Sequence, residues 1–432
     1  MKQTLKRFIV AEKSPGLQMN KFLLLLLTSY LCLCCEWVNG QIETNTSDSI
    51  EIAKQKEMLY YKSQRDLIDL GMMVVGKNPA LRLKDPETLN AELKVSLGPI
   101  IEYTLSTGFT GGIAASGAFS TSSSAPTNVS SVLFAAKYTQ KKQFLLPIQT
   151  SFWLPGNKFC LFGDWRYLDY PQNTYGFGGY TSANDVTAVA YKYIRFYETG
   201  LKRIKGNFYS GLGYQLDYHS NITQSGIAQG RVSDYTKYGF SSASTSSGIS
   251  ADFVYDTRKS SINPEGGSFY ANLMFLQNLT QIGSSSNSNS VLIDVRKYFQ
   301  LSRNLILALW SYNVITLSGN PPYLDLPGTG SDTYNNTGRG YELGRFIGKK
   351  MVDLEAELRF GITKNGLVGG VIFTNAESLS ELNNNKLAVI LPAAGMGLRI
   401  KFNKFSNTNA CIDYGVGKGG SRGFFGNLGE TF

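Results

Sequence analysis

Apolar and polar side chains alternate with a period of two along most of this chain, from residue 97 to residue 432. In residues 249–256, Ile, Ala, Phe and Tyr alternate with Ser and Asp, and residues 291–296 and 396–402 repeat the pattern with charged side chains on the polar side. Such alternation predicts β-strands with one apolar and one polar face. Strands with an aliphatic face and a charged face are typical of a wall between hydrocarbon and a polar lumen.

The length of the alternating region predicts how many strands it forms. A membrane-crossing strand with its connection takes about 20 residues, so residues 97–432 predict about 16 strands. We therefore predict an all-β fold, a transmembrane antiparallel β-barrel of about 16 strands, with its longest loops at 169–185, 218–242 and 318–348. A soluble β-sandwich would also alternate, but with fewer aromatic residues and shorter connections than the 25 Tyr, 25 Phe and 45 Gly indicate here.

The first 96 residues follow a different pattern. An apolar run at 22–33 follows Lys21, and Val38, Asn39 and Gly40 offer small residues for cleavage before Gln41, so residues 1–40 are predicted to be a signal peptide. The basic stretch before Met19 is unusually long for a signal peptide, which suggests that translation starts at Met19. Cys34 raises an alternative to signal-peptide cleavage before Gln41, namely lipid attachment at a cysteine. Residues 41–96 are predicted to form a short, partly helical periplasmic or plug segment, and residues 97–432 the barrel.

Composition narrows the function classes. The formal net charge of +10 is spread among acidic residues without a basic stripe, which favours contact with outer-membrane lipids and excludes a nucleic-acid surface. His219 is the only histidine, and its neighbours predict a solvated loop residue, so we expect no enzyme activity, no metal and no cofactor. Cys160 and Cys411 are expected to be unpaired wall residues.

The most specific local motif of the sequence is Gly338, Arg339, Gly340 and Tyr341. Glycines let the backbone approach closely, so this arginine can be carried into a crowded space, where it needs a carboxylate partner. The strand that follows offers Asp353, Glu355 and Glu357 on its charged face.

Several ordered motifs then carry a family resemblance: Trp165-Arg166-Tyr167; Tyr255-Asp256-Thr257-Arg258 with Asn263-Pro264-Glu265-Gly266-Gly267; Gly338-Arg339-Gly340-Tyr341; and the end from Ile412-Asp413-Tyr414-Gly415 to Phe432. In order and spacing, these resemble the BamA/TamA-type outer-membrane assembly family, also called the bacterial surface antigen family. The resemblance covers residues 97–432. It implies localisation in the outer membrane of a bacterial cell.

The resemblance also implies roles for particular residues. Gly338, Arg339, Gly340 and Tyr341 would form the tip of a lid loop folded inside the barrel. Arg339 would meet Glu357, and Phe373 and Asn375 would form the platform in the wall. Gly338 stands where the family has an aliphatic residue and Asn375 where it has an aspartate, so one ion pair would become a hydrogen bond. Phe432 would be the terminal aromatic of the last hairpin and act as the assembly signal.

Residues 41–96 are too few for a complete periplasmic domain of the kind that family members place before the barrel, so the chain resembles a short branch without periplasmic POTRA domains. The expected function is insertion or translocation of protein or lipid at the outer membrane, through a weak seam between the first and last strands. Periplasmic or outer-membrane proteins are the expected partners. A passive or gated solute channel, or a structural partner in an envelope complex, are the alternatives.

Overall fold

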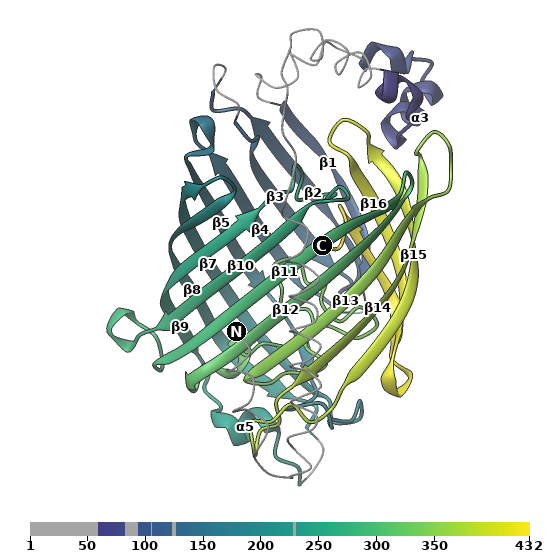
Figure 1. Cartoon of the computed structure of the whole chain (residues 1–432). Coiled ribbons are helices and arrows are strands. Elements are labelled where there is room, and N and C mark those ends of the chain that lie inside the picture. Colours follow the sequence, from purple (N-terminus) through teal and green to yellow (C-terminus); the bar gives the residue numbers. More distant parts are fainter. Residues whose placement is uncertain (1–58, 83–93, 105, 123–126, 228–229) are drawn as a thin grey trace, which may run out of the picture. The chain divides into compact units, whose positions relative to one another are not determined.

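Seventeen antiparallel strands in one sheet form the body of this computed structural model, which describes residues 59–82, 94–104, 106–122, 127–227 and 230–432 (Figure 1). All described residues belong to one compact unit, Gln55–Phe432. The predicted signal peptide and residues 41–58 lie outside the described part of the chain.

The strands follow in chain order. They are β1 (Lys94–Thr104), β2 (Gly108–Phe119), β3 (Ser130–Thr139), β4 (Phe144–Trp153), β5 (Phe159–Asp169), β6 (Gln172–Thr174), β7 (Thr187–Lys205), β8 (Phe208–Ser225), β9 (Ser244–Asp256), β10 (Phe269–Asn278), β11 (Ser288–Ser302), β12 (Leu305–Gly319), β13 (Lys350–Gly361), β14 (Val368–Leu379), β15 (Leu391–Asn403), β16 (Thr408–Gly417) and β17 (Arg422–Leu428).

The helices are short. They are α3 (Leu67–Val74) and α5 (Asp234–Gly239), with 3₁₀ turns η2 (Pro79–Arg82), η3 (Pro155–Asn157), η4 (Thr280–Ile282), η5 (Tyr323–Asp325) and η6 (Lys418–Gly420). None of the helices in the described ranges has the length and apolar character needed to cross a bilayer.

Each strand pairs with the next along the chain, which is the up-and-down order of a meandering wall. β6 pairs with β7 just beyond the end of β5, so it prolongs β5 and adds no new place in the wall. The described wall therefore has sixteen strand positions, counting β5 and β6 as one, and the predicted strand number is confirmed.

The first and last strands meet only at a seam. β1 and β17 are joined by one backbone pair, Thr104 opposite Phe425, whereas β1 pairs with β2 along its whole length. β17 is also the shortest of the strands beside the seam. In the described residues no ladder closes the sheet here, so the seam is the weakest line in the wall.

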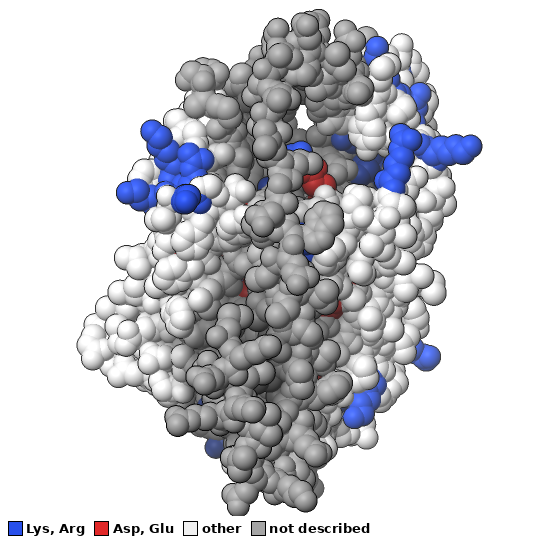
Figure 2. Space-filling view, in the orientation of Figure 1, with Lys and Arg blue, Asp and Glu red and all other residues white. Residues whose placement is uncertain are grey.

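The two faces of the wall differ as the alternation predicted. Residues directly opposite one another in a ladder share a face. Leu97, Ile113, Ile372 and Met396 lie on the outer face and are exposed apolar residues, whereas lumen-facing positions carry charges such as Glu357 and Arg399. In Figure 2 the wall on either side of the grey trace is largely white, with Lys and Arg gathered toward its two ends, as expected for the belt that faces hydrocarbon in a transmembrane barrel.

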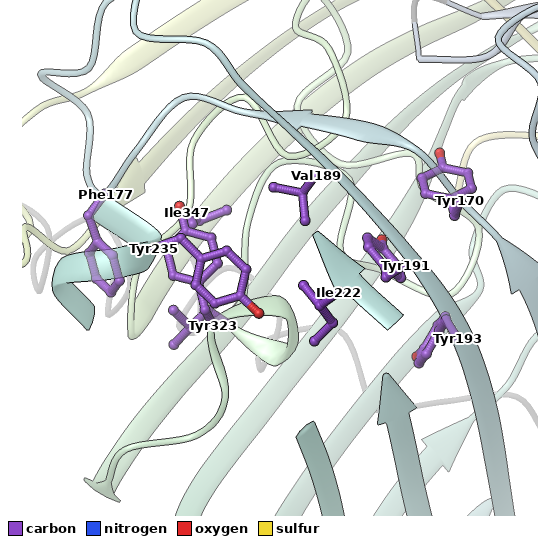
Figure 3. Packing of buried hydrophobic residues seen from close by; sticks show 10 residues of the cluster. Tyr170, Phe177, Val189, Tyr191, Tyr193, Ile222, Tyr235, Tyr323 and Ile347 are labelled. Atoms are coloured by element: carbon purple, nitrogen blue, oxygen red, sulfur yellow. The ribbon is translucent and has the colours of Figure 1, made fainter. Parts of the chain in front are cut away.

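The long loops gather at one end of the wall. The loops and the adjoining strand ends share a cluster of buried side chains (Figure 3). It comprises Tyr170, Phe177, Val189, Tyr191, Tyr193, Ile222, Tyr235, Tyr323, Leu326 and Ile347. Rings from three loops stack directly, with the Tyr235 and Tyr323 centroids 4.2 Å apart. This aromatic cluster joins the loops at that end of the wall.

One predicted loop was wrong in part. β8 continues as far as Ser225, so residues 218–225 are strand and not loop. The long alternation of Tyr, His, Asn and Thr there resembles loop composition, but these residues pair with β7 and β9. The predicted loops at 169–185 and 318–348 do lie between long strands.

At the opposite end, α3 docks on two turns of the wall. The Arg65 backbone N–H donates to the Asn365 carbonyl, and the Tyr61 and Phe405 rings lie 5.3 Å apart. Asp69, buried in α3, forms ion pairs with Arg82 at 2.7 Å and Lys404 at 2.8 Å. Residues 67–74 form the helix α3, which lies against these turns.

Candidate functional site: an arginine lid inside the barrel

The loop between β12 and β13, residues 320–349, enters the lumen. Asp332 shapes its turn, because its carboxylate accepts hydrogen bonds from the backbone N–H groups of Tyr334, Asn336 and Thr337 at 3.1, 2.7 and 2.7 Å. This arrangement holds the following residues, Gly338 and Arg339, against lumen-facing side chains of the wall. We call this segment the lid loop.

Arg339 is surrounded by carboxylates. Its Nη1 atom lies 2.7 Å from Glu357 Oε2 and 2.6 Å from Asp413 Oδ2, and its Nη2 atom lies 3.3 Å from Glu355 Oε2. The guanidinium also lies over the Phe373 ring, 3.9 Å from the centroid. With 2% of the Arg339 surface exposed, the ion pairs are almost fully removed from water.

Glycine is required on both sides of this contact. Gly340 has a φ of +116°, which side chains with a Cβ rarely adopt, and an added Cβ would lie 2.8 Å from Ala393 Cβ. On the facing strand, a Cβ at Gly415 would lie 2.9 Å from the Gly340 Cα. The lid backbone therefore touches the wall backbone directly, which is the close approach that the sequence predicted.

The other expected residues lie around this contact. Tyr341 is buried, donates from its hydroxyl to the Pro392 carbonyl at 2.7 Å and accepts from the Lys418 backbone N–H at 2.8 Å. Asn375 donates from Nδ2 to the Arg339 carbonyl at 2.8 Å. Asn375 thus binds the lid backbone and does not replace a carboxylate partner of the guanidinium.

Sequence reasoning missed one partner of this site and left another undecided. Glu355 was only one of three candidates, and Asp413 was not considered, because it lies 74 residues from Arg339 along the chain. Asp413 alternates with Ile412 and Tyr414, which indicates a lumen-facing carboxylate, but only the wall's closure brings β16 opposite the lid loop. Asp353, the third candidate, is buried without a hydrogen-bond partner among the described residues.

The lid carboxylates are shared with the segment that follows β17. Arg359 donates to Glu357 at 2.7 Å and to the Phe432 backbone oxygen at 2.8 Å. Arg399 contacts Asp413 and pairs with Glu430 at 2.8 Å. Asn336 of the lid loop also donates to the Thr431 carbonyl at 2.8 Å. One buried network therefore links the lid loop with residues 429–432.

Phe432 does not continue the last strand. β17 ends at Leu428, Gly429 has a φ of +94°, and the chain turns into the lumen. There the Phe432 ring packs on Trp310, with centroids 5.0 Å apart, and near Tyr298 at 6.5 Å. The Phe432 ring is therefore buried inside the wall, and its role as the assembly signal stays a prediction.

His219 was also predicted wrongly as a solvated loop residue. It lies in β8, buried, with its ring stacked on Tyr193 at 4.3 Å and its Nδ1 atom 3.3 Å from Asp325. Cys160 and Cys411 are buried and unpaired, as expected. The described ranges contain no group of His, Cys, Asp and Glu side chains arranged to hold a metal ion.

Comparisons with known proteins agree with this architecture. No family model and no curated protein matches the chain. Among solved structures it resembles BamA from Haemophilus ducreyi lacking POTRA domains 1–3, with 16% identity and a TM-score of 0.51, over 78% of this chain and 70% of that one. It also resembles CdiB from Escherichia coli, with 11% identity and a TM-score of 0.50, over 78% of this chain and 62% of that one.

This chain thus spans less than two thirds of the length of CdiB and somewhat more of the BamA fragment. At such low identities the likeness concerns the fold. The chain has the outer-membrane β-barrel fold of the BamA type.

Proposed function

We propose that this protein resides in the bacterial outer membrane and inserts or translocates protein or lipid there by opening its wall between β1 and β17. The observation that carries this proposal is the seam, where one backbone pair joins strands that elsewhere pair along their length. Opening there breaks few hydrogen bonds, whereas opening any other described strand pair breaks a whole ladder.

The lid loop supports an assembly role over a passive solute channel. Arg339 and its three carboxylate partners fill the lumen beside β13 and β16, and the aromatic cluster joins the loops at one end of the wall. A permanently open pore has no use for a buried ion cluster that blocks its path. The lid loop would instead hold the wall beside the seam in one arrangement until a client or partner displaces it.

The buried network of residues 429–432 connects the lid loop with the last strand beside the seam. Arg399 contacts Asp413, the carboxylate that Arg339 also binds, and pairs with Glu430 just after β17. Releasing the lid would therefore loosen the segment that anchors the last strand in the lumen. Outer-membrane lipids, and periplasmic or outer-membrane proteins that deliver clients, are the partners this mechanism requires.

Reconstitution tests the proposal. The purified protein is placed in phospholipid vesicles, and the insertion rate of a urea-unfolded eight-stranded outer-membrane barrel is followed by its shift in gel mobility. We expect faster insertion than in empty vesicles and in vesicles with a porin of similar size. A rate equal to that with the porin, together with steady solute flux through the protein, would assign the chain to the channel class.

A further inference from the structure

A row of polar residues crosses the outer face of the wall, away from the seam. Thr150 of β4 lies opposite Gly163 of β5, Gly163 opposite Glu198 of β7, and Glu198 opposite Tyr214 of β8. Residues opposite one another in a ladder share a face, so these four positions form one line across four strands. We call this line the transverse row.

The transverse row faces hydrocarbon and not the lumen. Along β7, Ile194 and Phe196 occupy the same face as Glu198 and are exposed, and Leu212 on β8 is 66% exposed. The alternate positions of β7, Arg195 and Tyr197, point the other way into a buried network around Asp217. Glu198 is therefore a carboxylate on the lipid-facing side of the wall.

Two lysines on the same face of β7 mark the edges of the apolar belt. Lys192 and Lys202 are both exposed, and the Lys202 ammonium lies over the Phe159 ring. At about 3.3 Å per residue and a tilt of about 40°, they are roughly 25 Å apart across the membrane, the height of the apolar band of such barrels. Glu198 then lies roughly 10 Å inside the belt from Lys202, too deep for a lipid headgroup to reach.

The side chains around Glu198 form a polar cluster. Trp165 Nε1 donates to Glu198 Oε2 at 3.1 Å, and the Trp165 ring stacks on Phe196 at 5.7 Å. Gly163 is required here, because a Cβ there would lie 2.7 Å from Glu198 Oε2 and 2.5 Å from Thr150 Oγ1, so these polar atoms close over the Gly163 backbone.

Hydrogen bonds among the described residues satisfy these polar groups only in part. Thr150 Oγ1 is buried without a hydrogen bond in the described part of the chain, and Glu198 Oε2 is the carboxylate oxygen that accepts one. Ionisable and polar groups inside a bilayer are costly unless another group satisfies them. Headgroups are too distant and the surrounding face is apolar, so the missing group must come from another chain within the membrane.

We propose that the transverse row is a docking site for a membrane-embedded protein segment that places a lysine, arginine or other hydrogen-bond donor against Glu198. Charge complementarity selects such a donor, because Glu198 is a carboxylate on a face whose neighbouring side chains Ile194, Phe196 and Leu212 are apolar. β7 is separated from both β1 and β17 by several strands, so the bound segment leaves the seam free to open. The site thus serves association and not the proposed insertion step.

A synthetic peptide tests the donor chemistry. The full protein, labelled with a donor dye at Leu212→Cys, is placed in phosphatidylcholine/phosphatidylglycerol vesicles with a leucine-rich membrane-spanning peptide that carries an acceptor dye. One peptide has a central lysine and its matched control a central leucine. We expect association about threefold tighter for the lysine peptide, the ratio that corresponds to about 0.6 kcal/mol for one intramembrane hydrogen bond.

Substitutions then locate the effect. Glu198→Leu should abolish the preference for lysine, whereas a dye moved to Met396→Cys on β15 should report no preference in the unsubstituted wall. Glu198→Gln keeps an acceptor for Trp165 and provides the measurement if the leucine variant fails to fold, with an expected partial loss. Equal energy transfer from both peptides would overturn the proposal, and so would transfer between two labelled copies without any response to the lysine peptide.

Discussion

Arg339 is held by charge, by stacking and by backbone contact at once. Two of its three carboxylate partners come from β13 and the third from β16, so the guanidinium joins distant parts of the wall. A lysine could not reproduce this arrangement, because it lacks the planar fork that bonds several carboxylates and stacks on Phe373.

Arg339→Ala should therefore release the lid loop. The substitution leaves Glu355, Glu357 and Asp413 with one cation fewer in a buried place, a change that typically costs about 3 to 5 kcal/mol. We expect faster protease cleavage within residues 320–349 and a lower unfolding temperature, with Arg339→Lys close to alanine in both. Tyr334→Ala, at an exposed position of the same loop, is the control. Unchanged cleavage in the Arg339 variants would refute the latch.

Asn375→Asp provides a second test at the same site. The family pattern suggested that an aspartate would tighten the latch, but Asn375 donates to the Arg339 carbonyl, and a carboxylate cannot donate this bond. The structure therefore reverses the expectation: Asn375→Asp should loosen the lid and raise the cleavage rate. Slower cleavage of the aspartate variant would mean that its carboxylate has joined the guanidinium partners.

At the scale of elements, the sequence predicts the strands of the wall better than the side-chain contacts inside the lumen. A period of two, read along residues such as 352–360, indicates strands and identifies their lumen faces, because one side must avoid hydrocarbon. It cannot indicate that Asp413 meets Arg339 or that Phe432 turns inward onto Trp310. Those contacts depend on which strands face one another across the lumen, and no local pattern records that.

The docked α3 segment gives a pH-dependent prediction. Burial by itself raises the pKa of Asp66, but hydrogen bonds from Arg82 and from the Lys404 and Asp69 backbone outweigh it, so the pKa lies below its ordinary value. A lowered pKa means that docking is favoured above the ordinary aspartate pKa of about 3.9 and is lost as pH falls through the folded-state value.

A spin label at Met73→Cys would follow this docking. It should be immobile at neutral pH and become mobile in acid, below about pH 4. Asp66→Ala should make the label mobile at neutral pH, whereas Lys77→Ala, at an exposed position just after the helix, should not. An immobile label in the Asp66 variant at pH 7 would show that the ion pairs do not hold the segment.

At the scale of the whole molecule, the lid loop and the aromatic cluster both place buried side chains on the lumen side of the wall. Ring contacts such as Phe177 with Tyr238 join loops that are far apart in sequence. The lumen-facing ion pairs fill the space below them. Solute flux and wall opening are therefore separable properties of this protein.

Conductance in planar bilayers checks the closed state. The unsubstituted protein should be closed for most of the recording, because the latched lid fills the lumen beside β13 and β16. Arg339→Ala should open more often. A large, steady conductance that the substitution leaves unchanged would favour the solute channel.

The seam tests the central claim most directly. By the register of Thr104 with Phe425, Tyr103 lies opposite Gly426, so the pair Tyr103→Cys and Gly426→Cys should form a disulfide across the seam. In the vesicle assay, we predict that the oxidised protein loses its acceleration of barrel insertion, that reduction restores it, and that the matched pair Leu97→Cys and Ala115→Cys, across the permanent β1–β2 ladder, has no effect. Full insertion activity with the seam disulfide closed would contradict the account.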